Sequence, residues 1–235
     1  MIQVIPSNER YHADHGWLST HWHFSFGDYH DVNNMGFGPL RVFNDDVVQP
    51  RSGFGMHPHR DMEIVTYVID GQLEHTDHLG HRGVIKTGEV QVMSAGKGIV
   101  HAEKNPSADR PVNLLQLWLL PRHNSNAPRY DQRAFEDANR RGRLMPVVSG
   151  DGAVPDTLAI DQDATIYVST LAADEAVTHA AAAAGRRTYL FVIKGDVTVN
   201  GTRLNTRDQG RIVDEPALDV TAGAGGAEFM LIDLP

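Results

Sequence analysis

Short apolar segments rich in β-branched and aromatic residues recur along the chain, each bounded by glycine, proline or aspartate. Clear examples are residues 40–43, 64–69, 90–93 and 114–120. This composition and spacing are typical of β-strands separated by turns. Many short strands with little helical periodicity predict an antiparallel sandwich or barrel.

Turn and helix signals are fewer. The dipeptides Asp70-Gly71 and Asn200-Gly201 each lie between apolar runs, and such dipeptides favour the tight turns of β-hairpins. We therefore expect a hairpin at each of them. The best helix candidate covers residues 132–141, and the alanine run 180–184 is a weaker one.

A faint internal repeat divides the chain into two halves. Residues 66–71, TYVIDG, resemble residues 190–195, LFVIKG, and each segment is followed by a strand-like stretch and a polar turn. We interpret the repeat as duplication of a β-barrel unit. The loop-rich region near 122–160 suits a connection, which predicts an N-terminal domain over residues 1–122 and a C-terminal domain over 123–235.

Composition narrows the range of partners. The net charge of −9 argues against nucleic acid, because binding phosphates requires clustered Lys and Arg. No apolar run approaches the length of a membrane span, and the N-terminus lacks the basic start and apolar core of a secretory signal. We expect a soluble, cytoplasmic monomer. Because the chain has no cysteine, any metal must be held by nitrogen and oxygen ligands.

Histidine is concentrated in the first half: of the 13 histidines, all but His123 and His179 lie within the first 101 residues. His57 and His59 are separated by one proline, so on an extended chain both rings lie on one face. His101 and Glu103 have the same spacing. Two such pairs on neighbouring strands would direct three imidazoles and one carboxylate to one point, a set suited to divalent Fe, Ni, Cu, Mn or Zn.

Each signal also has a simpler interpretation. A lone His-x-His is more often part of a polar surface than a ligand pair, and a histidine beside a carboxylate commonly makes only a hydrogen bond. The co-occurrence of both pairs, each after a glycine-rich turn, favours a metal site with positions left open for water, substrate or O2. His75, His78 and His81 lie in a polar stretch with broken alternation, and we interpret that stretch as a solvated turn.

The two motifs resemble the paired motifs of the cupin superfamily. The general cupin pattern places a ligand at Glu63, whereas a glutamate two residues after the second-motif histidine, as at Glu103, is the variation seen in pirins. Ser94 stands where the second cupin motif usually has proline, and the gap from glycine to histidine is longer than usual. Several N-terminal stretches also look like pirin hallmarks: His15-Gly-Trp-Leu, Phe24-Ser-Phe, Asn34-Met-Gly-Phe and Phe54-Gly-Met-His-Pro-His. The chain is most similar to bacterial pirin-like proteins with quercetin 2,3-dioxygenase activity.

This resemblance implies an all-β bicupin fold, with two antiparallel jelly-roll barrels packed together and few short helices. It implies the metal ligands His57, His59, His101 and Glu103, and leaves Glu63 to orient an imidazole through its other nitrogen. The second half has no His-x-His, so its barrel should be metal-free. Fe(II) is the expected ion, with Cu, Ni, Mn, Co and Zn as alternatives.

The activity implied by the resemblance is cleavage of the central ring of flavonols such as quercetin by O2, with release of CO and a depside. The metal would act as a Lewis acid on the 3-hydroxyl, and Glu103 would be the general base. The candidates for the apolar substrate pocket are Phe24, Phe26, Met35, Phe37 and Met93. The competing hypothesis is a metal-binding regulatory protein that acts through protein partners. Sugar isomerase chemistry, found in other cupins, fits the pirin-like N-terminal stretch less well.

Overall fold

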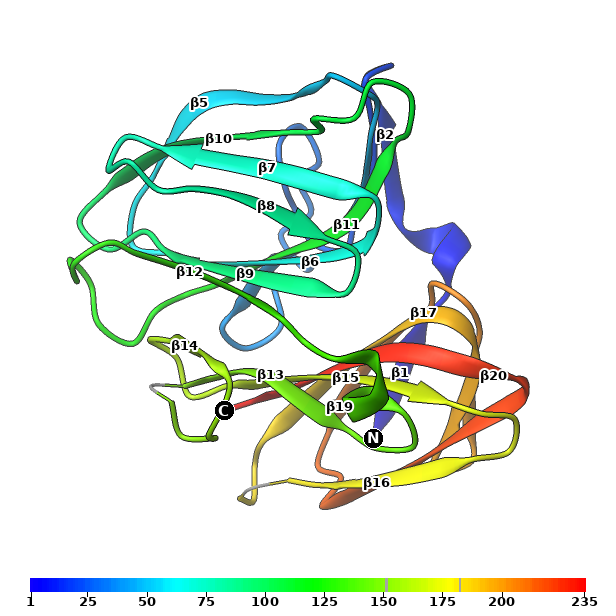
Figure 1. Cartoon of the computed structure of the whole chain (residues 1–235). Coiled ribbons are helices and arrows are strands. Elements are labelled where there is room, and N and C mark those ends of the chain that lie inside the picture. The colour runs from blue at the N-terminus through cyan, green and yellow to red at the C-terminus, as the bar shows by residue number, and fades with distance from the viewer. Residues whose placement is uncertain (151, 182) are drawn as a thin grey trace. The chain divides into compact units, whose positions relative to one another are not determined.

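The structure is a computed structural model, and it describes residues 1–150, 152–181 and 183–235. Strands and turns dominate these residues, and the helical elements among them are two short 3-10 segments, η1 (Ser7–Glu9) and η2 (Asp137–Arg140). The chain forms two compact units (Figure 1). The N-terminal unit comprises Tyr11–Phe135 and Leu158–Gln162; the C-terminal unit comprises Met1–Arg10, Glu136–Thr157 and Asp163–Pro235.

The N-terminal unit contains two antiparallel sheets. The larger has the order β12-β9-β6-β11-β4-β3-β2 and the smaller β5-β10-β7-β8; in Figure 1 the smaller sheet lies over β6, β9 and β11. The strands of the larger sheet are β2 (Tyr11–Asp14), β3 (Leu18–Trp22), β4 (Leu40–Val48), β6 (Glu63–Asp70), β9 (Glu89–Ser94), β11 (Val112–Leu119) and β12 (Arg129–Ala134). Those of the smaller sheet are β5 (Gly53–His59), β7 (Gln72–Asp77), β8 (Arg82–Lys86) and β10 (Ile99–Lys104). The short strand β14 (Leu158–Ile160) also belongs to this unit.

The C-terminal unit is built on an antiparallel sheet with the order β1-β19-β17-β20-β15-β13, to which β16 is added along β20 and β18 along β17. Its strands are β1 (Ile2–Ile5), β13 (Met145–Gly150), β15 (Thr165–Leu171), β16 (Ala176–Ala180), β17 (Arg187–Val199), β18 (Thr202–Leu204), β19 (Gln209–Val213) and β20 (Ala217–Leu234). Its core consists of buried aliphatic and aromatic side chains such as Leu190, Val192, Val220, Phe229 and Leu231. Burial of this apolar surface is the main stabilising contribution to the unit.

The strand predictions from periodicity are confirmed. Segments 40–43, 64–69 and 90–93 lie inside β4, β6 and β9, and segment 114–120 coincides with β11 except for Leu120. The predicted all-β architecture with few short helices is likewise confirmed. β6 is buried on both faces over Glu63–Ile69, which accounts for its nearly continuous apolar sequence.

The helix predicted over residues 132–141 is wrong. Its first residues belong to β12, which pairs with β9 from Arg129↔Ser94 to Ala134↔Glu89, and only η2 follows. Ladder hydrogen bonds with β9 therefore outweigh the local helical preference of this segment. The alanine run is not helical in its described part either: Ala180 ends β16, Ala183 and Ala184 lie in a turn region, and Ala182 lies outside the described residues.

One of the two predicted hairpins forms. At Asn200-Gly201, β17 pairs with β18 through Val199↔Thr202, and both turn residues have positive φ, 45° and 82°. At Asp70-Gly71 the turn exists, with φ 90° at Gly71, but no hairpin results. β6 pairs with β9 and β11 whereas β7 pairs with β8 and β10, so Gly71 carries the chain from one sheet into the other.

The units differ from the expected domains at three places, one of which is Leu158–Gln162, a part of the N-terminal unit. Residues 1–10 belong to the C-terminal unit, because β1 pairs with β19 from Ile2↔Ile212 to Ile5↔Gln209. Residues 123–135 belong to the N-terminal unit because β12 completes its larger sheet. The region 122–160, expected to be loop-rich, contains β12, η2, β13 and β14; Asp151 lies outside the described residues. No helix in the described part of the chain is both long and apolar enough to cross a membrane.

Candidate metal centre

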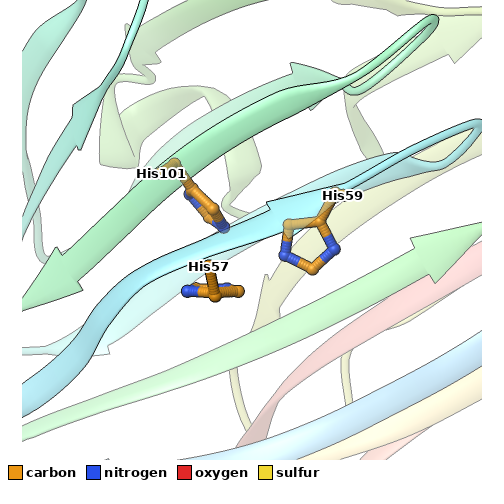
Figure 2. Close-up of side chains that lie close together, drawn as sticks. All are labelled: His57, His59 and His101. Atoms are coloured by element: carbon orange, nitrogen blue, oxygen red, sulfur yellow. The ribbon is translucent and has the colours of Figure 1, made fainter.

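The two histidine motifs lie on neighbouring strands, as the sequence predicts. β5 and β10 pair antiparallel with His57 directly opposite His101. The register shifts between His101 and Glu103, so Glu103 pairs with Phe54. Figure 2 shows the rings of His57, His59 and His101 gathered in one place, two from β5 and one from β10.

Two groups of potential ligand atoms share His101. One nitrogen each of His57, His59 and His101 lie within 4.8 Å of one another, and ligand atoms of His75, His101 and Glu103 do the same. The ring centroid of His101 is 4.4 Å from that of His57 and 4.9 Å from that of His59. The structure thus brings the three predicted histidines together, sets Glu103 beside His101, and adds His75.

Several acceptor atoms of these residues are not used in hydrogen bonds and could coordinate a cation. His101 Nε2 and Glu103 Oε1 are buried and have no hydrogen-bond partner among the described residues. Such atoms are rare in folded proteins, because burial without a partner is unfavourable. His57 Nδ1 lies 2.7 Å from the Gly55 carbonyl oxygen, so it donates its proton there and leaves Nε2 with a free lone pair. Three imidazoles and a carboxylate with free acceptor atoms fit a divalent metal.

Burial keeps the imidazoles in the form that binds metal. Desolvation, with smaller contributions from neighbouring histidines, lowers the pKa of His59 to about 4 and that of His101 to about 2. Neutral imidazoles offer the lone pairs that coordination requires. Burial raises the pKa of Glu103, and a hydrogen bond from Gln116 partly opposes that rise.

Strand β11 supports Glu103 from the opposite sheet. Gln116 Nε2 donates to Glu103 Oε2 at 2.8 Å, and Gln116 Oε1 accepts a hydrogen bond from Trp118 Nε1 at 3.2 Å. The indole of Trp118 also meets the ring of His59 edge-on, with centroids 4.8 Å apart. One strand therefore fixes the carboxylate and packs against an imidazole of the cluster.

Glu63 does not orient an imidazole, contrary to expectation. It is buried, and Ser94 Oγ donates a hydrogen bond to it at 2.6 Å. Its other recorded interactions are with the main chain of Asp161 and the charge of Arg129, and desolvation raises its pKa. Glu63 thus belongs to a polar network at the N-terminal end of β6.

The interpretation of His75 as part of a solvated turn is wrong. His75 is fully buried in β7, pairs in register with Glu103 of β10, and lies 3.3 Å from His101 between their Nδ1 atoms. The side chains of Leu73, His75 and Asp77 alternate inward along β7, although the stretch is too polar for its sequence to reveal that alternation. His78, in contrast, is exposed as expected, and His81 is partly exposed.

A cavity of about 340 Å³ lies in the N-terminal unit beside the cluster. Gln116, which holds Glu103, and Phe54, which pairs with Glu103 across the strands, are part of its wall. The remaining lining residues come mainly from β3, β4 and the segment after β3: His15, Trp17, Leu18, Thr20, Trp22, Phe26, Gly27, Asp28, Asn44 and Asp46.

The pocket residues expected from the sequence are mostly elsewhere. Phe26 lines the cavity, but Phe24 is buried and Met93 packs in a core cluster with Ile64 and Ile99. The aromatic wall consists instead of Trp17, Trp22, Phe26 and Phe54. Those tryptophans were overlooked because their direction depends on strand register, which the sequence does not supply.

The cavity also has acceptor atoms without donors. Asn44 Oδ1 and Asp46 Oδ1 are buried and have no hydrogen-bond partner within the described parts of the chain. Burial raises the pKa of Asp46 to about 7; the Thr20 hydroxyl opposes this rise, and the charges of Asp45 and Glu103 contribute to it. A ligand that donates hydrogen bonds would satisfy both residues.

A Asp46→Asn variant is expected to be more stable than the parent protein at pH 8. The folded pKa of about 7 lies above the ordinary 3.8, so folding favours the protonated acid and stability falls as pH rises between these values. Asparagine lacks this penalty, and the gain should be on the order of 4 kcal/mol at pH 8 and vanish near pH 4.

Thermal unfolding of both proteins across that pH range measures the effect. Asp28→Asn, which removes an exposed carboxylate from the same cavity wall, is the matched control and should show no pH-dependent gain. An equal gain for Asp46→Asn at pH 4 and pH 8 would contradict this account of the buried carboxyl.

The fold and the cluster together define a cupin-type, metal-binding protein. Comparison with known proteins refines this class. Residues 5–119 match the family model described as Pirin, and residues 146–234 match the one described as Quercetinase C-terminal cupin domain. The chain belongs to the pirin family.

Relatives match over the full length. The chain is 44% identical to quercetin 2,3-dioxygenase of Escherichia coli K12, over 100% of this chain and 99% of that protein. It is also 44% identical to a pirin-like protein of Caulobacter vibrioides, with 99% of each chain covered. The crystal structure of the bacterial pirin YhhW from Escherichia coli in complex with nickel(II) superposes with a TM-score of 0.94 at 45% identity, over 100% of this chain and 99% of that one. The chain is accordingly an enzyme of the dioxygenase class.

Proposed function

We propose that His57, His59, His101 and Glu103 hold one divalent metal ion in the N-terminal unit. The support is the convergence of the three histidines on paired strands, the place of Glu103 beside His101, the atoms of His101 and Glu103 that lack a hydrogen-bond partner among the described residues, and the lowered pKa of His59 and His101. We expect Fe(II) as the native ion. The nickel(II) complex of the relative YhhW is consistent with a site that accepts several first-row ions. The C-terminal unit has a structural role in this proposal and holds no metal.

The proposed reaction is cleavage of the central ring of a flavonol such as quercetin by O2, which yields a depside and CO. The observation that carries the proposal is the aromatic cavity next to Glu103 and Gln116. Flat aromatic rings suit the walls of Trp17, Trp22 and Phe26, and phenolic hydroxyls can donate hydrogen bonds to Asn44 and Asp46.

Different residues of the chain would have different roles in this reaction. A metal ion held at the site supplies Lewis acidity, which lowers the pKa of a flavonol hydroxyl. Glu103, which is also a proposed ligand, accepts the proton of the 3-hydroxyl through its carboxylate, of which the Oε1 atom has no hydrogen-bond partner among the described residues. Gln116 holds the other carboxylate oxygen, so this proton acceptor keeps its orientation. The apolar walls exclude water, so the flavonol anion reacts with O2 in a dry pocket.

A pair of substrates that differ at one hydroxyl tests this proposal. Quercetin carries the 3-hydroxyl and luteolin lacks it, while the other hydroxyls are the same. The metal-loaded protein is expected to consume O2 with quercetin and not with luteolin, and to release CO only with quercetin. Equal O2 uptake with both would exclude deprotonation of the 3-hydroxyl as the step that Glu103 serves. No uptake across a flavonol panel with metal bound would favour the regulatory hypothesis.

A further inference from the structure

A row of polar side chains extends from His101 on the side of β10 that faces β7 and lies away from β5. His75 Nδ1 is 3.3 Å from His101 Nδ1, His75 Nε2 is 3.5 Å from Asp77 Oδ2, and His81 Nδ1 is 2.7 Å from the same oxygen. The side chains of His75 and Asp77 are completely buried, whereas that of His81 is 41% exposed. The row therefore runs from His101 to the protein surface.

The chemistry of His101 fixes the direction of these hydrogen bonds. If Nε2 of His101 binds the metal, as the proposed function requires, its Nδ1 carries the proton and donates to His75 Nδ1. His75 then carries its own proton on Nε2, which faces the carboxylate of Asp77. A histidine has one proton to place when neutral, so each ring in the row is held in a single tautomer.

Asp77 is built to remain an anion. Burial alone would raise its pKa, but hydrogen bonds from the side chain and main chain of His81, and from His75, lower it. Its Oδ1 atom also accepts the main-chain N–H groups of Leu79 and His81, at 2.9 and 3.0 Å. The carboxylate is thus fixed by the turn that follows β7 and cannot rotate away from His75.

Packing holds His75 in place as well. Its ring stacks on Tyr130 with centroids 4.5 Å apart and an interplanar angle of 27°, and His81 stacks on the same tyrosine at 5.4 Å. The Tyr130 hydroxyl donates to Gln132 Oε1 at 2.7 Å, which fixes the tyrosine. A Cβ at Gly83 would clash with that hydroxyl and with Gln132 Oε1, so a side chain on the neighbouring strand would displace Gln132 or Tyr130.

We propose that His75 and Asp77 are positioning residues for the metal centre: through the Nδ1 atom of His101 they fix its tautomer and ring orientation and increase the electron donation of its Nε2 atom to the metal. The proposal rests on the proposed ligand set, and it assigns a role to residues outside that set. Partners of this kind typically change metal affinity 10–100-fold when removed.

Cobalt(II) binding to the purified protein tests the proposal, with the dissociation constant and the visible d–d spectrum as readouts. His75→Leu removes the hydrogen bond to His101 and the 3.5 Å contact with Asp77, and it is expected to weaken Co(II) binding roughly 10–100-fold and to shift the spectrum. His75→Asn keeps an acceptor near the Nδ1 position and should restore most of the affinity. Asp77→Asn keeps the main-chain hydrogen bonds of the turn and should weaken binding less than His75→Leu. His30→Gln, which changes an exposed histidine of the N-terminal unit outside this turn, is the control and should match the parent protein.

The outcomes distinguish a failure of this positioning role from a failure of the proposed function. Parental affinity and spectrum in both His75→Leu and Asp77→Asn would overturn it. A complete loss of binding in His75→Leu and His75→Asn alike, with the fold intact by circular dichroism, would make His75 a ligand and would also overturn it. Co(II) binding that follows the expected order in a protein inactive on flavonols would support the positioning role and refute only the proposed function.

Discussion

A His101→Ala variant is expected to fold but to retain neither bound metal nor flavonol-dependent O2 consumption. His101 belongs to both groups of ligand atoms, and its buried Nε2 atom has no hydrogen-bond partner in residues 1–150, 152–181 and 183–235. Loss of the metal removes several kcal/mol of transition-state stabilisation, so turnover should fall at least roughly a thousandfold. Metal analysis and an O2 electrode measure both effects.

A buried histidine outside the cluster provides the matched control. His179 is 5% exposed and pairs with Asp233 at 3.3 Å in the C-terminal unit. His179→Gln should keep the full metal content and turnover below its unfolding temperature. Full metal content in the alanine variants of His57, His59 and His101 alike would refute the proposed site.

Glu103→Gln is expected to reduce turnover far more than Glu63→Gln. Glutamine cannot accept the substrate proton, and loss of a general base typically lowers turnover 10²–10⁴-fold. Metal content should also fall at Glu103, because the amide is a weaker ligand than the carboxylate. Both residues are buried and have a raised pKa, so the pair is matched in environment.

Glu63→Gln should leave metal content unchanged. Its hydrogen bond from Ser94 can be retained by the amide oxygen, and no interaction between Glu63 and the cluster is recorded in the described part of the chain. Steady-state kinetics with quercetin and metal analysis compare the two variants. A larger loss at Glu63 would mean that the general cupin pattern applies in place of the pirin pattern.

Most strands could be predicted because strand formation depends on local alternation of apolar residues and on turn residues. Which strands pair with one another could not be predicted, and this accounts for the wrong helix and hairpin predictions. The segment 132–141 has helical preference in isolation, yet β12 forms because β9 offers it an unpaired edge. The Asp70-Gly71 turn is a sound local prediction, but whether the next strand folds back or crosses to another sheet is decided by distant strands.

The same distinction applies to the site. His57, His59 and His101 could be found because one-residue spacing places side chains on one face of a strand. His75 was missed because its role depends on β7 lying next to β10, and a buried histidine in a polar sequence looks like a turn. The strand register places Gln116 of β11 between Asn44 of β4 and Thr66 of β6, which are far apart in the sequence. Sequence spacing gives no information about such cross-strand neighbours.

The most direct test of the central claim is the stoichiometry of CO release by the anaerobically purified protein after its metal content has been determined. We predict close to one metal ion per chain, about one CO released for each O2 consumed with quercetin, loss of both gas exchanges on chelation, and their return when the metal is added back. CO release that continues in the metal-free protein, or a metal-loaded protein that consumes O2 with quercetin without releasing CO, would contradict the account.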